Sequence, residues 1–123
     1  MNLNVSFSQE ILKRERTLSP SDFGFHNALR RSDGTIVFLD FEYFGWDDPA
    51  KTISDFLLHP AQNLDPSLKD HFLKKMLNSF SKSPFLQERL SVFYPLYALK
   101  WCLILLNEFL VSELQRRNFA GAM

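Results

Sequence analysis

Apolar residues follow two different patterns along the chain, and the patterns predict where strands and helices lie. Residues 35–41, TIVFLDF, are apolar without alternation and rich in β-branched and aromatic side chains, which predicts a strand buried on both faces. The short mixed segment 27–31 precedes this strand, and Ser32-Asp33-Gly34 between the two supplies turn-forming residues. Together these features predict a β-hairpin over residues 27–41.

The helices are predicted from apolar spacing and from proline. Residues 7–17 have a short helical pattern with Ser8 as a candidate N-cap, which ends before Ser19-Pro20 because a residue preceding proline avoids the α region. Proline is well tolerated in the first turn of a helix, so Asp48-Pro49, Asp65-Pro66 and Ser83-Pro84 mark three further helix starts. We expect the corresponding helices over residues 49–59, 66–81 and 84–117, with Pro95 as the place for a kink.

The last of these helices is apolar nearly all round between Leu96 and Leu110, which is typical of a helix at the centre of a bundle. Residues 92–111 also have the length of about 20 residues that a membrane span needs. Lys100 in the middle of this segment argues against a span, because lysine at a bilayer centre costs roughly 2.5–3.5 kcal/mol. We therefore expect a buried helix and no membrane, with Cys102 as a small buried residue.

The composition fits one globular domain over residues 1–123. The chain is 46% hydrophobic and 23% charged, and its thirteen phenylalanines are enough to build a core. The formal net charge is zero, so no broad electrostatic attraction to nucleic acid is expected. A single cysteine excludes an internal disulfide and a cysteine-based zinc site, and the N-terminus does not have the pattern of a signal peptide. The expected compartment is the cytoplasm.

Three polar residues around the predicted hairpin carry the candidate chemistry. Asn27 follows Asp22 by five residues, and Asp40 comes after the apolar run of the strand. Phosphoryl transfer needs a carboxylate to orient the acceptor hydroxyl and take its proton, and oxygen ligands for magnesium. In kinases the base aspartate precedes a metal-binding asparagine by five residues, and a second metal-binding aspartate follows a strand. Taken alone, Asp22 and Asn27 are better explained by turn formation, which these residue types favour.

The wider segment 19–56 adds further motifs to this pair. The chain has PSD-x-x-x-x-N at residues 20–27, LDFE at 39–42 and DDPA at 47–50. This order resembles the aminoglycoside phosphotransferase and choline kinase-like enzymes, which share the protein kinase fold. Their usual stretch reads roughly HGD-x-x-x-x-N, a hairpin, I-D-[FWY]-E, and a loop that ends in G-D-P-A. The resemblance is specific over about a third of the chain and general over the helical remainder.

The resemblance implies an ATP- and Mg²⁺-dependent phosphotransferase, a small-molecule kinase that moves a phosphoryl group to a hydroxyl of its acceptor. By position, Asp22 corresponds to the catalytic base and Asn27 and Asp40 to magnesium ligands, whereas Asp48 corresponds to an acid with a structural role. The implied fold is α+β and mostly helical, a kinase-like C-lobe. Its catalytic and metal-binding loops would occupy residues 19–49, followed by a helical subdomain over 50–117.

The sequence also departs from the family pattern. Pro20 and Ser21 replace the histidine and glycine of HGD, and His26 lies next to Asn27 rather than mid-loop, so we assign His26 no catalytic role. Only eighteen residues precede Ser19, and they contain no Gly-rich loop or strand lysine to hold phosphates. The chain thus resembles a C-lobe without its N-lobe, which we expect to be inactive by itself. The alternative is a truncated, inactive helical module that binds a partner or self-associates through an exposed lobe interface.

The other polar and aromatic candidates have simpler explanations. His59 and His71 are isolated in the sequence and are expected at the surface or at helix ends. Glu42 is expected to be a structural or solvated loop carboxylate, and Trp46 is expected to pack rather than to line a substrate pocket.

Overall fold

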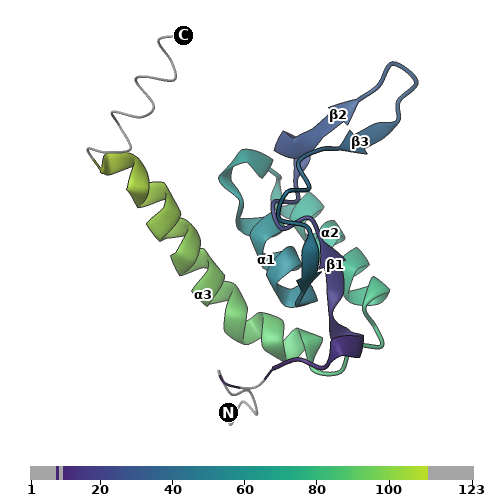
Figure 1. Ribbon diagram of the computed structural model, residues 1–123, viewed down its shortest axis with the longest axis vertical. Helices are drawn as coiled ribbons and strands as arrows, with labels where there is room; N and C mark the ends of the chain where they lie inside the picture. The colour runs from purple at the N-terminus through teal and green to yellow at the C-terminus, as the bar shows by residue number, and fades with distance from the viewer. Residues whose placement is uncertain (1–7, 9, 111–123) are drawn as a thin grey trace.

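The computed structural model describes residue 8 and residues 10–110, and it shows an α+β chain that is mostly helical (Figure 1). Four short strands come first: β1 (Thr17–Ser19), β2 (Ala28–Arg30), β3 (Ile36–Phe38) and β4 (Gly45–Asp47). Three α-helices follow: α1 (Pro49–Leu58), α2 (Pro66–Ser79) and α3 (Leu86–Leu106). Single 3₁₀ turns complete the order: η1 (Lys13–Glu15), η2 (Phe25–Asn27), η3 (Pro60–Gln62) and η4 (Asn107–Phe109).

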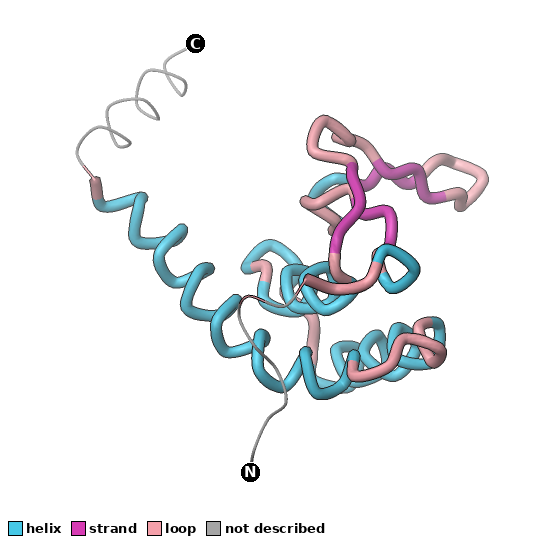
Figure 2. Tube along the Cα trace, turned by 60° about the horizontal axis from the view of Figure 1, so that its bottom comes forward, coloured by secondary structure: helices cyan, strands magenta, loops and turns pink. Residues whose placement is uncertain are grey.

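The strands form two separate antiparallel pairs, which lie together on one side of the molecule in Figure 2. β1 pairs with β4, so that Leu18 lies opposite Trp46. The predicted helix over 7–17 is therefore wrong for its described residues: they contain one 3₁₀ turn, and Thr17 already belongs to β1. Its short apolar pattern cannot outweigh backbone pairing with a strand almost thirty residues later.

The β2–β3 hairpin is present as predicted, but its predicted burial is wrong. Ala28 pairs with Phe38 and Arg30 with Ile36, and Gly34 in the turn takes the positive φ of 86° that glycine allows. Leu29 is 58% exposed and Ile36 is 51% exposed. Figure 1 shows the reason, because the hairpin projects from the body and no described element covers its outer face.

The core lies between α1 and the first turns of α3. Its buried apolar residues are Ala50, Ile53, Phe56, Leu57, Leu86 and Leu90. α2 packs its apolar stripe against this cluster, and the rings of Phe56 and Phe72 stack with centroids 3.9 Å apart. Phe23 from the loop after β1 also contacts Phe56, at 5.4 Å between centroids. The core therefore ties the loop that carries Asp22 to α1.

The prediction that α3 lies at the centre of a bundle is wrong for its C-terminal half. Figure 1 shows this half running away from the rest of the molecule, and Cys102, predicted to be buried, is exposed. The helix begins at Leu86 rather than at residue 84 and continues through Pro95. Its predicted end at residue 117 lies outside the described residues.

Candidate functional site

Asp22 lies in the loop after β1, where Ser21 has a strained backbone conformation and Ser19 fixes the turn by hydrogen bonds. Ser19 is buried, and its Oγ accepts hydrogen bonds from the backbone N of Ser21 at 3.1 Å and from Thr52 Oγ1 at 3.1 Å. Ser21 has a φ of 67°, in the left-handed region that favours glycine. In the family pattern that this segment resembles, the corresponding residue is glycine. The backbone geometry at Ser21 is thus one that a glycine would adopt without strain.

A buried glutamine fixes the next part of the loop. Gln62 is only 6% exposed; its Oε1 accepts from the backbone N of Phe25 at 3.2 Å, and its Nε2 donates to the carbonyl of Phe23 at 3.5 Å. Gly24 lies between these two contacts, and a Cβ placed there would be 1.7 Å from Gln62 Nε2. Position 24 therefore has no room for a side chain, which explains its glycine although its φ of 177° is ordinary extended backbone.

Asp22 and Asn27 contact each other directly. Asn27 Nδ2 donates to the backbone carbonyl of Asp22 at 3.0 Å and to its Oδ2 at 3.2 Å. The five-residue spacing in the sequence thus places the amide of one residue on the carboxylate of the other. Because Nδ2 is used in this way, Oδ1 of Asn27 is the amide atom left for a ligand.

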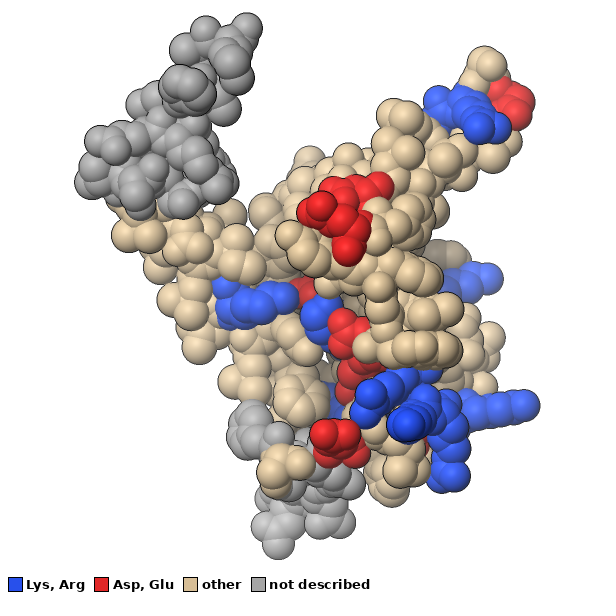
Figure 3. Space-filling view, in the orientation of Figure 1, with Lys and Arg blue, Asp and Glu red and all other residues tan. Residues whose placement is uncertain are grey.

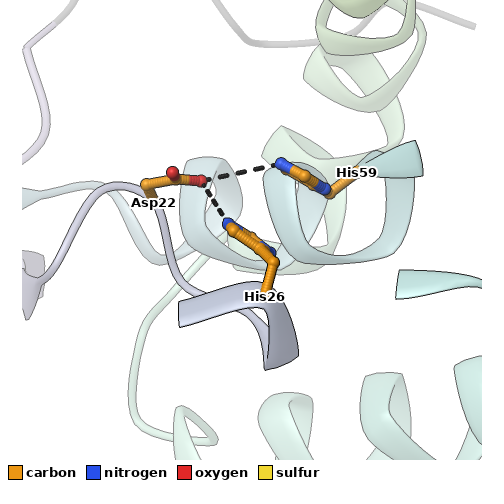
Figure 4. A group of neighbouring side chains, drawn as sticks. All are labelled: Asp22, His26 and His59. Atoms are coloured by element: carbon orange, nitrogen blue, oxygen red, sulfur yellow. Dashed lines mark hydrogen bonds and ion pairs between the residues drawn. The ribbon is translucent and has the colours of Figure 1, made fainter. Parts of the chain in front are cut away.

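Two histidines complete the surroundings of Asp22, as Figure 4 shows. His26 Nε2 lies 3.0 Å from Asp22 Oδ1, and His59 Nε2 lies 3.7 Å from the same oxygen. The two imidazole rings stack with centroids 4.1 Å apart and planes only 9° apart. The Asp22 side chain is about half exposed, at 47%, whereas that of His59 is 15% exposed. The expectation that His59 lies at a helix end is confirmed, because it is the C-cap of α1. The fold also brings it beside Asp22, a residue far away in the sequence.

The tautomer of His59 follows from its second hydrogen bond. Its Nδ1 accepts from the backbone N of Ala61 at 3.1 Å, where His59 caps η3. Neutral His59 must therefore carry its proton on Nε2, the nitrogen that faces Asp22. Burial, followed by the charge of nearby His26, lowers the pKa of His59 below its ordinary value of 6.5.

The same tautomer decides what this group can bind. Asp22, His26 and His59 offer three ligand atoms within 4.8 Å of one another, which is the donor set of many transition-metal sites. A metal ion at His59 Nε2 would need that nitrogen unprotonated, and would then force a proton onto Nδ1 against the Ala61 N–H. The nearly parallel rings also cannot both direct an in-plane lone pair at one ion. The arrangement therefore favours imidazole N–H groups that face the Asp22 carboxylate over a bound metal ion.

Asp40 reaches the same region through the hairpin. The backbone N of Leu39 donates to the carbonyl of Asn27 at 2.8 Å, so the chain leaving β3 runs beside Asn27. Asp40 itself is exposed and has a φ of 61°, a strained conformation of the kind found at functional sites. In the described residues, no hydrogen bond or ion pair joins its side chain to Asp22 or Asn27.

Asp48 has a structural position next to this region. Its Oδ1 caps α1 by accepting from the backbone N of Ala50 at 2.9 Å, as the Asp48-Pro49 pair predicts. Arg89 on α3, whose side chain is 8% exposed, donates from Nε to Asp48 Oδ2 at 3.0 Å. Sequence reasoning did not identify Arg89, because its partner lies 41 residues away.

A second ion pair explains the lysine in the apolar part of α3. Asp55 Oδ1 accepts from Lys100 Nζ at 2.5 Å and from Trp101 Nε1 at 3.0 Å, and Asp55 Oδ2 lies 3.5 Å from Lys51 Nζ. Tyr97 lies on the same side of α3, and burial, helped by the charges of Asp47, Asp55 and Asp48, raises its pKa to about 12. These contacts attach the middle of α3 to α1.

A hollow of about 530 Å³ lies elsewhere, between α2 and α3. It is lined mainly by apolar side chains such as Leu73, Leu77 and Tyr94, and none of the candidate site residues lines it.

Comparison of the chain with protein-family models, with curated proteins and with solved structures finds no match. Any assignment of the loop region therefore has to rest on its own geometry and chemistry.

Proposed function

We propose that Asp22, Asn27 and Asp40 are the base and the metal ligands of a phosphotransferase site that acts on a hydroxyl of a small molecule. The observation that carries the proposal is the bond from Asn27 Nδ2 to Asp22 Oδ2, together with the hairpin that returns Asp40 beside Asn27. The order base, asparagine, strand and aspartate is the one that protein kinases use for phosphoryl transfer. The left-handed backbone of Ser21 supports it too, because the related motif has glycine there.

The donor atoms suit magnesium. An amide oxygen and a carboxylate are hard oxygen ligands, and Mg²⁺ commonly binds one or two such groups and keeps several waters. Within the described residues no hydrogen bond is made to Asn27 Oδ1, and the Asp40 side chain is exposed. When bound there, Mg²⁺ would neutralise the charge of the nucleotide phosphates.

Asp22 would orient the acceptor hydroxyl and take its proton. The two carboxylate oxygens of Asp22 have different neighbours. His26 and His59 face Oδ1, whereas Asn27 donates a hydrogen bond to Oδ2. Oδ2 therefore keeps the more accessible lone pair, and we assign the proton transfer to it. His26 and His59 act as positioning residues that hold the carboxylate of Asp22 in place.

The metal part of the proposal is tested by Mn²⁺ as a paramagnetic stand-in for Mg²⁺. NMR spectra of the full chain, with and without ATP, would show which side chains lie near the ion. We expect Mn²⁺ to broaden the side-chain amide signals of Asn27. In the Asp40→Asn variant, about ten times more Mn²⁺ should be needed for the same broadening. Asp33→Asn is the matched control, because Asp33 is an exposed acid in the turn of the same hairpin.

Two results would contradict the metal assignment. One is broadening that spares Asn27 in the unmodified chain. The other is equal weakening by Asp40→Asn and Asp33→Asn, which would indicate a diffuse attraction of cations to surface acids.

A further inference from the structure

The hollow of about 530 Å³ between α2 and α3 is built from one stripe of each helix. Lys69, Leu73 and Leu77 line it from α2, four residues apart and therefore on one side of that helix. Leu90 and Tyr94 line it from α3 at the same spacing. Sites for small molecules have volumes of roughly 300–1,000 Å³ and mainly apolar walls with a few polar groups, and the hollow has both properties.

The walls of the hollow belong to the folded body of the protein. Leu90 and Leu57, which lines the hollow from α1, are core residues, and Leu73, Leu77 and Tyr94 pack against the core. α3 is long and apolar enough to cross a membrane by length and composition, but its first turns contribute buried residues to this core. The part of α3 that lines the hollow is therefore fixed by packing rather than free to leave the body.

The polar side chains at the hollow are not balanced in charge. Lys69 is partly buried, and in the described part of the chain no ion pair or hydrogen bond involves its ammonium group. Asp70 also lines the hollow, but its Oδ2 lies 2.6 Å from Lys74 Nζ, which neutralises its charge. Gln87 and Tyr94 add an amide and a hydroxyl that can donate hydrogen bonds. The hollow thus offers a positive charge and further donors beside an apolar wall.

From these features we propose that the hollow binds a small molecule with an apolar chain and a carboxylate head. The chain lies against the leucines and Tyr94, where removal of its surface from water favours binding. The carboxylate lies at Lys69, since a hydrogen bond between an ammonium and a carboxylate is stronger than one between neutral groups. The phosphotransferase site is separate from the hollow, so the proposal does not depend on it.

Octanoate is the probe, and NMR of the full chain with isotope-labelled leucine methyl groups follows its binding. We expect octanoate to shift the Leu73 and Leu77 signals until they saturate, with dissociation in the millimolar range. Hexanoate should bind more weakly, by about fourfold for each methylene group that is lost from the buried chain. Leu99 and Leu103 are the internal control and should not shift. They are 58% exposed on the outer half of α3, where Figure 3 shows almost no charged side chains.

Lys69→Gln tests recognition of the carboxylate. It should weaken binding of octanoate by about fivefold and leave binding of uncharged octan-1-ol unchanged, because only the carboxylate contacts the ammonium. Lys75→Gln is the matched control, since Lys75 is exposed on α2, about 120° around the helix from Lys69, and does not line the hollow. It should leave the binding of both molecules unchanged.

Ser91→Trp tests the location of the site. Ser91 is exposed and lines the hollow, and its Oγ donates to the carbonyl of Glu88 in its own helix. An indole at this position should fill the hollow and abolish the octanoate shift at Leu73. Ser79→Trp is the matched control: Ser79 is exposed on α2 outside the hollow, and its Oγ also donates to a carbonyl of its own helix, that of Lys75. Circular dichroism confirms that the variants are folded.

Four outcomes would overturn the proposal. The first is the absence of a saturable shift at Leu73 and Leu77, and the second is an equal shift at Leu99, which would indicate undirected apolar contact. The third is an equal effect of the two lysine variants on octanoate, which would indicate diffuse attraction of anions. The fourth is a change of the Leu73 and Leu77 signals with protein concentration in the absence of octanoate, which would assign the hollow to a second copy of the chain.

Discussion

Ser21 is the residue whose backbone conformation conflicts most clearly with its side chain. Its φ of 67° is costly for any residue with a Cβ, by about 1–2 kcal/mol, and glycine avoids this cost. Its hydroxyl also accepts from Lys51 Nζ at 3.2 Å. Replacement by glycine and by alanine both remove this bond, but only glycine relieves the backbone.

We therefore predict that Ser21→Gly is more stable than Ser21→Ala by about 1 kcal/mol in the free energy of unfolding. Urea denaturation of both variants beside the unmodified chain measures the difference. Equal stability of the two variants would show that the left-handed conformation at this position is not retained in solution.

His59 links the stability of the fold to pH. Its pKa is lowered in the folded chain, by burial first and by the charge of His26 second. The unfolded chain therefore binds more protons than the folded chain just below pH 6.5, so the free energy of unfolding falls as the pH is lowered through 6.5. Above this pH, the contribution of His59 no longer changes.

We predict that His59→Gln removes most of this loss of stability between neutral pH and pH 5, because glutamine does not titrate. Thermal unfolding at several pH values measures it. His71→Gln serves as the matched control, since it makes the same replacement at an exposed position on α2. An NMR titration that places the pKa of His59 at or above 6.5 would contradict the interpretation.

At the scale of elements, two helices begin with the same Asp-Pro pair but in different surroundings. Asp65 caps α2 at the surface, accepting from the backbone N of Ser67 at 2.9 Å and of Leu68 at 3.0 Å. Asp48 caps α1 and in addition receives the guanidinium of Arg89. Because Arg89 is buried, loss of Asp48 would leave a charge without its partner.

Asp48→Ala should therefore lower the free energy of unfolding by about 3 kcal/mol or more, through the lost cap and the unpaired buried charge. Asp65→Ala should cause a clearly smaller loss, since only an exposed cap is removed. Chemical denaturation of both variants makes the comparison. Losses of equal size would mean that Arg89 finds other partners, such as the carbonyl of Pro84, which it already contacts at 2.9 Å.

At the scale of the whole molecule, the loop that carries Asp22 depends on three contacts from α1 and the η3 turn that follows it. Thr52 bonds Ser19 from α1, Gln62 bonds the loop from η3, and His59 reaches Asp22 from the end of α1. α1 is in turn attached to α3 through Asp55 and Asp48. The geometry around Asp22 is therefore a property of the assembled fold rather than of the loop alone.

The sequence by itself determined the local features of this protein. Proline after a capping aspartate marks the starts of α1 and α2, and a glycine turn marks the hairpin, because these signals act between neighbouring residues. The five-residue spacing of Asp22 and Asn27 is also local, and the structure shows these two residues in contact.

Only the tertiary structure decided what lies far apart in the sequence. The pairing of β1 with β4, the stacking of His59 on His26 and the burial of Arg89 against Asp48 each join segments more than twenty residues apart. The tertiary structure also decided which apolar residues are exposed. An apolar run such as TIVFLDF or residues 96–110 favours burial, but its sequence does not specify which element covers it. The position of His59 beside Asp22 follows from how the helices pack, which local spacing does not specify.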